Sequence, residues 1–282
     1  MKKLLPLLLC IVLFCAACAP QTVENPEPIV LPSQEAENDT ERSGPFPTSQ
    51  EPEIPKTTQP YIVKDISYLI VDGCESGTLI LTDGEEIFTL SGDYPDLRDG
   101  MSVQMTFGII AETYPAQICG VEKIEPLETP MGGYFDLCGL YLDVLEDLWN
   151  KDEGLNGGAS YISVDLSKAP GELSDGAKKA IAWIFANRHG AEALTYTIDE
   201  LSEKGYLAPY GEPAISECFE DGLLFTITPF TRQFREYNTT VINFDACKWR
   251  SPLGAYMFSD CTAVWSQTGE RSGYSIGSEM IS

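Results

Sequence analysis

The chain has 282 residues and a strongly acidic composition, with 43 Asp and Glu residues against 18 Lys and Arg and a formal net charge of −25. A surface with this charge repels nucleic-acid phosphates and anionic lipid headgroups. Composition therefore argues against nucleic acid as a partner and against membrane binding through a basic patch. The length is sufficient for two modest hydrophobic cores, so we expect two folded domains.

The N-terminus has the pattern of a secretion signal. Met1-Lys2-Lys3 precedes an uncharged apolar run from Leu4 to Ala17, which is shorter than the roughly 20 residues that a membrane span needs. The run ends in Cys15-Ala16-Ala17-Cys18, which resembles the lipobox of bacterial lipoproteins. The resemblance implies that residues 1–17 are a signal peptide and that Cys18 becomes the N-terminus, carrying palmitate-type acyl chains.

A lipidated Cys18 implies an extracytoplasmic protein held at the cell membrane through its lipid anchor, because two acyl chains suffice for stable attachment. A plain secretory signal with an incidental cysteine is the alternative. Residues 18–60 follow, and from Ala19 to Pro60 they contain nine prolines and eight acidic residues. This composition predicts a disordered linker that reaches up to roughly 100 Å, either to cross a cell wall or as a simple spacer.

Residues 61–128 have the pattern of a small all-β domain. Turn signals at Asp72-Gly73, Asp83-Gly84 and Asp99-Gly100 separate short alternating segments, which predicts five strands in a closed or nearly closed barrel. The expected strands are Ile66 to Val71, Gly77 to Leu81, Glu86 to Leu90, Met101 to Ile110 and Ala116 to Ile124.

Two segments of this domain, Leu97 to Val103 and Tyr114 to Ile118, resemble the OB-like barrel domains of Gram-positive lipoproteins. The resemblance implies a fold and a cellular setting, and no activity. Lys64, Arg98 and Lys123 are the only cations between residues 61 and 128, so the basic groove that nucleic-acid binding needs is missing.

Residues 132–282 change to a helical period and then to a period of two. We expect helices along the stripes Leu137 to Leu148 and Ala177 to Phe185, the second with its N-cap at Ser174. Thr197 to Glu200 is a capping-box pattern, and Gly205 marks the end of that short helix. Later alternating segments predict an antiparallel meander, so the domain is expected to be α+β, of the cystatin or nuclear-transport-factor type.

Six of the nine cysteines lie outside the signal and anchor, namely Cys74, Cys119, Cys138, Cys218, Cys247 and Cys261. None forms C-x-x-C and the chain has one histidine, so neither a zinc site nor a thioredoxin-like centre is indicated, and we expect no cofactor. A turn centred on Gly254 predicts a disulfide between Cys247 and Cys261. Cys74 and Cys119 form a second candidate pair. Free, packed thiols are the alternative.

Catalytic patterns are weak. Gly273-Tyr274-Ser275-Ile276-Gly277 matches a nucleophile elbow, but only five residues follow it and His189 lies upstream. His189 is expected to complete the end of a helix. The loop at residues 150–158 is rich in oxygen ligands but lacks the order of a calcium-binding EF-hand, which favours a simple loop.

The expected function is binding rather than catalysis. Trp249, Tyr256, Trp265 and Tyr274 either line a binding face for a protein, peptide or glycan ligand or belong to the core. The alternative is a secreted cell-wall or glycan hydrolase that uses carboxylates such as Asp143 and Asp147. The absence of a convincing catalytic set favours a surface-exposed interaction module.

Overall fold

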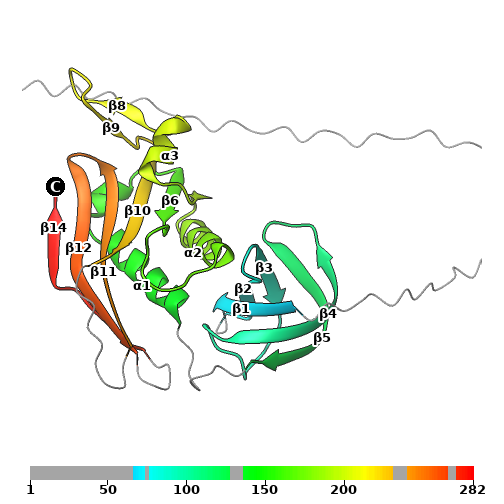
Figure 1. Ribbon diagram of the computed structural model, residues 1–282. Helices are drawn as coiled ribbons and strands as arrows, with labels where there is room; N and C mark the ends of the chain where they lie inside the picture. The colour runs from blue at the N-terminus through cyan, green and yellow to red at the C-terminus, as the bar shows by residue number, and fades with distance from the viewer. Residues whose placement is uncertain (1–65, 74–75, 128–135, 231–239, 266–270) are drawn as a thin grey trace, which may run out of the picture. The chain divides into compact units, whose positions relative to one another are not determined.

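The computed structural model describes residues 66–73, 76–127, 136–230, 240–265 and 271–282. Strands dominate this part of the chain, as a closed five-stranded barrel and a separate seven-stranded sheet that carries the helices (Figure 1). Within these ranges, no helix is long and apolar enough to cross a membrane. The signal, Cys18 and the linker lie outside the described residues.

The barrel confirms all five predicted strands, with small displacements at their ends. Its strand order is β1-β2-β3-β5-β4, with β4 paired to β1 and β5 paired in parallel to β3, which closes the ring. Alternate residues of β1 to β4 fill the interior, as the strand period of two requires, and β5 adds Ile118 with the partly buried Val121 and Ile124. The strands are β1 (Ile66–Asp72), β2 (Thr78–Thr82), β3 (Ile87–Ser91), β4 (Ser102–Ala111) and β5 (Ala116–Pro126).

The turn between β2 and β3 shows why the Asp-Gly signals were informative. The carboxylate of Asp83 accepts hydrogen bonds from the backbone amides of Glu85 and Glu86, at 3.0 and 2.9 Å. Gly84 has φ +104°, a conformation that disfavours residues with a Cβ atom. Asp83 and Gly84 therefore supply the two local features that a tight reversal needs.

The seven-stranded sheet has the order β13-β12-β11-β10-β6-β7, and β14 pairs with the other end of β12. A two-stranded ribbon, β8-β9, is separate. The elements in chain order are α1 (Leu137–Trp149), η1 (Glu153–Asn156), β6 (Tyr161–Asp165), α2 (Asp175–Arg188), β7 (Glu192–Leu194), α3 (Ile198–Glu203), β8 (Ala208–Tyr210), β9 (Ser216–Cys218), β10 (Gly222–Pro229), β11 (Thr240–Ser251), β12 (Gly254–Trp265), β13 (Arg271–Ser275) and β14 (Ser278–Ile281).

The three predicted helices and the antiparallel strands β10 to β13 are present, but the expected order of helices first and strands afterwards is wrong. Strand β6 lies between α1 and α2 and pairs in parallel with β10, and β7 pairs in parallel with β6. A parallel neighbour requires a crossover, which α2 provides. The five residues of β6 include Ser163 and Asp165, so their apolar pattern was too short to be recognised.

Helix α2 is packed on two sides. The main core joins its apolar residues to those of the sheet, such as Phe225, and to Val71, Ile80 and Ile87 of the barrel strands. Small residues permit this close packing, and the amide of Gly176 donates to the carbonyl of Gly84 at 2.9 Å. Helix α2 therefore contributes to one hydrophobic core that it shares with strands of the barrel and strands of the sheet.

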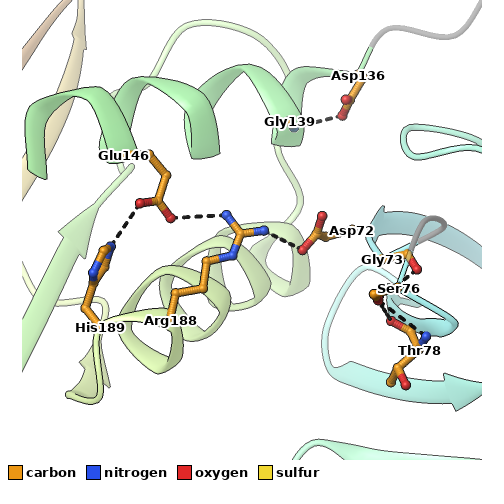
Figure 2. A network of polar contacts seen from close by, with 9 residues as sticks. All are labelled: Asp72, Gly73, Ser76, Thr78, Asp136, Gly139, Glu146, Arg188 and His189. Atoms are coloured by element: carbon orange, nitrogen blue, oxygen red, sulfur yellow. Dashed lines mark hydrogen bonds and ion pairs between the residues drawn. The ribbon is translucent and has the colours of Figure 1, made fainter. Parts of the chain in front are cut away.

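A polar network accompanies this packing at the end of α2 (Figure 2). Arg188 donates to Asp72 on β1 at 2.7 Å and to Glu146 on α1 at 3.2 Å, and His189 Nε2 lies 3.0 Å from the other oxygen of Glu146. The His189 ring stacks on Trp149 with centroids 3.8 Å apart. His189 is the C-cap of α2, as expected, and the network orients β1, α1 and α2 rather than adding much stability.

The predicted disulfide between Cys247 and Cys261 is wrong. The hairpin turns before Gly254, which was the predicted centre and is instead the first residue of β12. Cys247 therefore lies opposite Met257, and Cys261 lies opposite Phe244. Both thiols are free.

Cys138 is buried and Cys247 is half-buried, and both are small apolar packing groups. Burial raises the pKa of Cys247 to about 11 and that of Cys138 to about 12, which keeps both thiols protonated and unreactive. Cys119 is also a free thiol, and Cys74, its expected partner, lies outside the described residues. These observations support the alternative of packed thiols.

We expect Gly176→Ala to destabilise the protein by about 1 to 2 kcal/mol, because a Cβ atom there would overlap Oγ1 of Thr82 and meet the Glu85 backbone. This overlap outweighs the gain in helix propensity from alanine. Gly157→Ala is the control, since a Cβ at Gly157 has nothing within 4 Å. Urea unfolding of both variants measures the difference, and equal stabilities would contradict the close packing of α2 against the barrel.

Candidate functional site: an aromatic cluster on the sheet

The nucleophile-elbow pattern does not have the geometry of an elbow. Ser275 is the last residue of β13 and is followed by β14, where an elbow needs a helix. Its hydroxyl lies 3.5 Å from the carbonyl of Thr262. His189 lies at the end of α2, in contact with Glu146 and Trp149. The match is therefore a coincidence of sequence.

The carboxylates proposed for a hydrolase lie on one helix. Asp143 and Asp147 are one turn apart on α1, and Asp147 accepts a hydrogen bond from the Tyr274 hydroxyl at 2.5 Å. Desolvation and this hydrogen bond raise the pKa of Tyr274. Glycoside hydrolysis needs two carboxyl groups that face each other across a substrate. Neighbours on one helix face do not provide this arrangement.

The oxygen-rich loop after α1 surrounds a lysine of the protein itself. The Lys248 side chain is fully buried. Its ammonium donates to the carbonyls of Trp149 and Asp152 at 3.3 and 3.2 Å, and to Oδ1 of Asn156 at 3.1 Å. The carbonyl of Lys151 is a further acceptor. The loop therefore wraps a built-in cation, and the described residues contain no cluster of three His, Cys, Asp or Glu side chains placed to hold a metal.

Desolvation lowers the pKa of Lys248 to about 8, against the opposing influence of the Asp152 and Glu153 carboxylates. The ammonium nevertheless donates to the Trp149 carbonyl at the end of α1, which also accepts a hydrogen bond from the Asn156 side chain at 2.9 Å. Lys248 is thus a structural residue that fixes the loop between α1 and β6.

The prediction that Trp249, Tyr256, Trp265 and Tyr274 share one binding face is wrong. Trp265 is fully buried, and Tyr256 and Tyr274 pack against the same main core on the helix side of the sheet. Trp249 packs instead on a different cluster. The reason is strand parity: on β11 Lys248 faces the helices, so its neighbour Trp249 points to the opposite face.

Trp249 belongs to an aromatic cluster on that opposite face. The buried centre consists of Leu194, Leu201, Phe219 and Leu224. Four partly exposed rings surround this centre, and we call them the aromatic cluster: Tyr161, Tyr196, Tyr206 and Trp249.

The short helix α3 places two of these rings. Thr197 is its N-cap and forms a capping box with Glu200. Tyr196, just before the cap, packs on the centre that contains Leu201, in the positions of a hydrophobic staple. At the other end, the amide of Tyr206 donates to the carbonyl of Leu201 at 2.9 Å, which is the long bond of a Schellman motif. Both helix ends thus direct a tyrosine onto Leu201.

Gly205 makes the second of these ends possible. It has φ +78°, and its amide donates to the carbonyl of Ser202 at 3.0 Å. This left-handed residue reverses the chain immediately after α3 and brings Tyr206 back onto the helix. The helix end thereby determines where the Tyr206 ring lies.

Ser163 attaches the Tyr196 backbone to the sheet. Its side chain is fully buried, donates to the Tyr196 carbonyl at 2.7 Å and accepts from the Tyr196 amide at 3.0 Å. Tyr161 lies two residues earlier on β6, so alternation directs it to the same face as Ser163. The cluster is therefore built on the sheet as well as on α3.

The tyrosine rings pack against one another at angles. Tyr161 and Tyr206 meet edge to face with centroids 5.3 Å apart, and Tyr196 and Tyr206 are tilted at 6.0 Å. The ammonium of Lys204 lies over the Tyr196 ring, 4.8 Å from its centroid. Desolvation raises the pKa of Tyr206, and the neighbouring Tyr196, Tyr161 and Glu192 add to the rise. Glu192 lies opposite Tyr161 in the register of β6 with β7, so one carboxylate belongs to the surroundings of the cluster.

Sequence reasoning identified Trp249 but missed the three tyrosines. Two of the tyrosines could have been found from the helix-end motifs in the sequence. Tyr196 directly precedes the capping box that begins at Thr197, and Tyr206 directly follows Gly205, which ends the helix. What the sequence did not show is that Tyr161, more than thirty residues earlier, joins them through the pairing of β6 with β7.

Comparison with known proteins gives no relatives: no family model matches the chain, and neither curated proteins nor solved structures give a significant match.

We expect Lys248→Met to destabilise the protein by about 3 kcal/mol, because it removes the buried ammonium on which the carbonyls of Trp149 and Asp152 and the Asn156 side chain converge. Lys178→Met is the control, since that side chain makes an exposed ion pair with Asp175. Urea unfolding reports both values. Equal small losses would show that Lys248 does not hold the loop.

Proposed function

We propose that this chain is a membrane-anchored, extracytoplasmic binding lipoprotein and that the aromatic cluster is its ligand face. The observation that carries the proposal is the cluster itself, because four partly exposed aromatic rings gather outside the main core on one face of the sheet. Rings with an apolar body and a polar tip are enriched at interfaces, where they supply contact area at low entropic cost.

The proposed location of the protein at the membrane is based on its sequence. The signal pattern and Cys18 support lipidation, and the acidic composition supports attachment through acyl chains rather than through a basic surface. The ligand classes are a protein, a peptide or a glycan, and nucleic acid is excluded from the proposal by charge.

The finer assignment of the fold is part of the proposal. The closure of β5 on β3 and of β4 on β1 supports an OB-like barrel as the presenting module. The packing of α1 and α2 on one face of a largely antiparallel sheet supports an α+β second domain. Strands β6 and β7 are parallel additions to the cystatin or nuclear-transport-factor arrangement.

The anchor is tested by Cys18→Ala. We expect the variant to leave the membrane fraction and to incorporate no labelled fatty acid, because the acyl chains attach to that cysteine. Labelled palmitate and fractionation of cells that express either form measure this. Fatty acid on the variant would show that another residue carries the lipid.

The ligand face is tested with the full chain on defined peptide and glycan arrays. Tyr206→Ala and Trp249→Ala should each weaken binding about tenfold, since a buried aromatic contact contributes on the order of 1.4 kcal/mol. Tyr114→Ala is the matched control, because Tyr114 is an exposed barrel tyrosine outside the cluster. Binding that survives both cluster variants unchanged would place the ligand face elsewhere.

A further inference from the structure

The rings of the aromatic cluster form angled walls, and this shape bears on what they bind. The planes of Tyr161 and Tyr206 meet at 76°, and those of Tyr196 and Tyr206 at 45°. A sugar ring stacks on a flat, open aromatic surface, which tyrosines packed edge to face do not offer. A cation needs only an accessible ring face, and the Tyr196 face already accepts an ammonium group.

The electrostatic surroundings favour the same ligand. Aromatic ring faces carry partial negative charge, and Glu192, which is exposed and lies opposite Tyr161 in the pairing of β6 with β7, adds a carboxylate. The whole chain carries a formal charge of −25, which raises the local concentration of cations and repels anions. The aromatic cluster and the negative electrostatic potential of the whole protein therefore both favour a positively charged ligand.

One ring face already holds a cation from the chain itself. Lys204, the C-cap of α3, places its ammonium over Tyr196, and Lys204 is exposed. An exposed lysine on a flexible stem leaves such a position easily, because a cation–π contact at an exposed site is weak. Lys204 therefore marks a cation position that an external ligand can take over.

We propose that the aromatic cluster binds the ammonium or guanidinium group of a basic peptide, and that Lys204 is an intramolecular competitor for the Tyr196 ring. This inference rests on the proposed function, since it specifies the ligand of the same site. Tyr206 and Tyr196 provide the cation-facing walls, Glu192 provides the counter-charge, and Trp249 extends the apolar contact on the neighbouring strands.

The test uses the full chain and two probes, tetralysine and tetralysine with its side chains acetylated, which lacks the side-chain positive charges. Calorimetric titration at fixed ionic strength should show binding of tetralysine and at least tenfold weaker binding of the acetylated peptide. Tyr206→Ala should weaken tetralysine binding about tenfold, whereas Tyr206→Phe should retain it, because phenylalanine preserves the ring face.

Lys204→Gln gives the sharper result. It removes the internal competitor, so we expect tetralysine to bind about threefold or more tightly than to the wild type. Lys178→Gln is the matched control, because it removes the same charge from α2 at a residue outside the cluster. Thermal unfolding of each variant confirms that the fold is retained.

The outcomes separate the inference from the proposed function. If Lys204→Gln and Lys178→Gln increased the affinity for tetralysine equally, the change in net charge would explain the increase, and Lys204 would not be a competitor. If the acetylated peptide or a neutral oligosaccharide bound as tightly and lost affinity in Tyr206→Ala, cation recognition would be wrong while the binding face stood. Tetralysine binding that is indifferent to Tyr206→Ala would overturn the cation site at this cluster.

Discussion

Helix α2 lies within a single core that includes residues of both the barrel and the sheet, and much of the remaining arrangement depends on that double burial. Its alanines and Gly176 keep the helix narrow enough for close packing, and Phe185 and Ile181 fill the space toward the strands. Because the helix crosses from β6 to β7, its position also fixes the parallel edge of the sheet. The polar network at Arg188 then orients the elements that the apolar contacts have brought together.

Because α1 and α2 lie on one face and the short α3 on the other, the two faces of the sheet have different surroundings. The face toward α1 and α2 takes the large buried residues, including Phe225, Phe258 and Trp265. The other face carries the aromatic cluster, where only a small centre under α3 is fully buried. Helix α3 has only six residues, of which Leu201 is buried against this centre, and the tyrosines that flank the helix remain partly exposed.

Cations are scarce in this chain, and several have specific partners. Lys248 binds the carbonyls at the end of α1. Arg250, two residues later on β11, donates to the carbonyls of Leu155 and Gly157 at 2.7 and 2.6 Å, so two cations of one strand hold the same loop. Lys204 lies over Tyr196. The first two are integral to the fold because their partners are backbone oxygens, whereas the third rests on an exposed ring and is replaceable.

Local signals in the sequence determined the secondary structure well. The Asp-Gly turns, the N-cap at Ser174 and the capping box at Thr197 act through hydrogen bonds within a few residues, so their pattern predicts them directly. The five barrel strands followed from the same turns. Tertiary structure alone decided which partners meet: the register that separates Cys247 from Cys261, the parallel pairing of β6, and the split of Trp249 from Trp265 onto opposite faces. A shift of a residue or two in a turn changes a strand's partners, and a shift of one exchanges its faces, while composition and periodicity stay the same. The aromatic cluster joins residues from distant segments through those pairings, so only the folded chain brings it together.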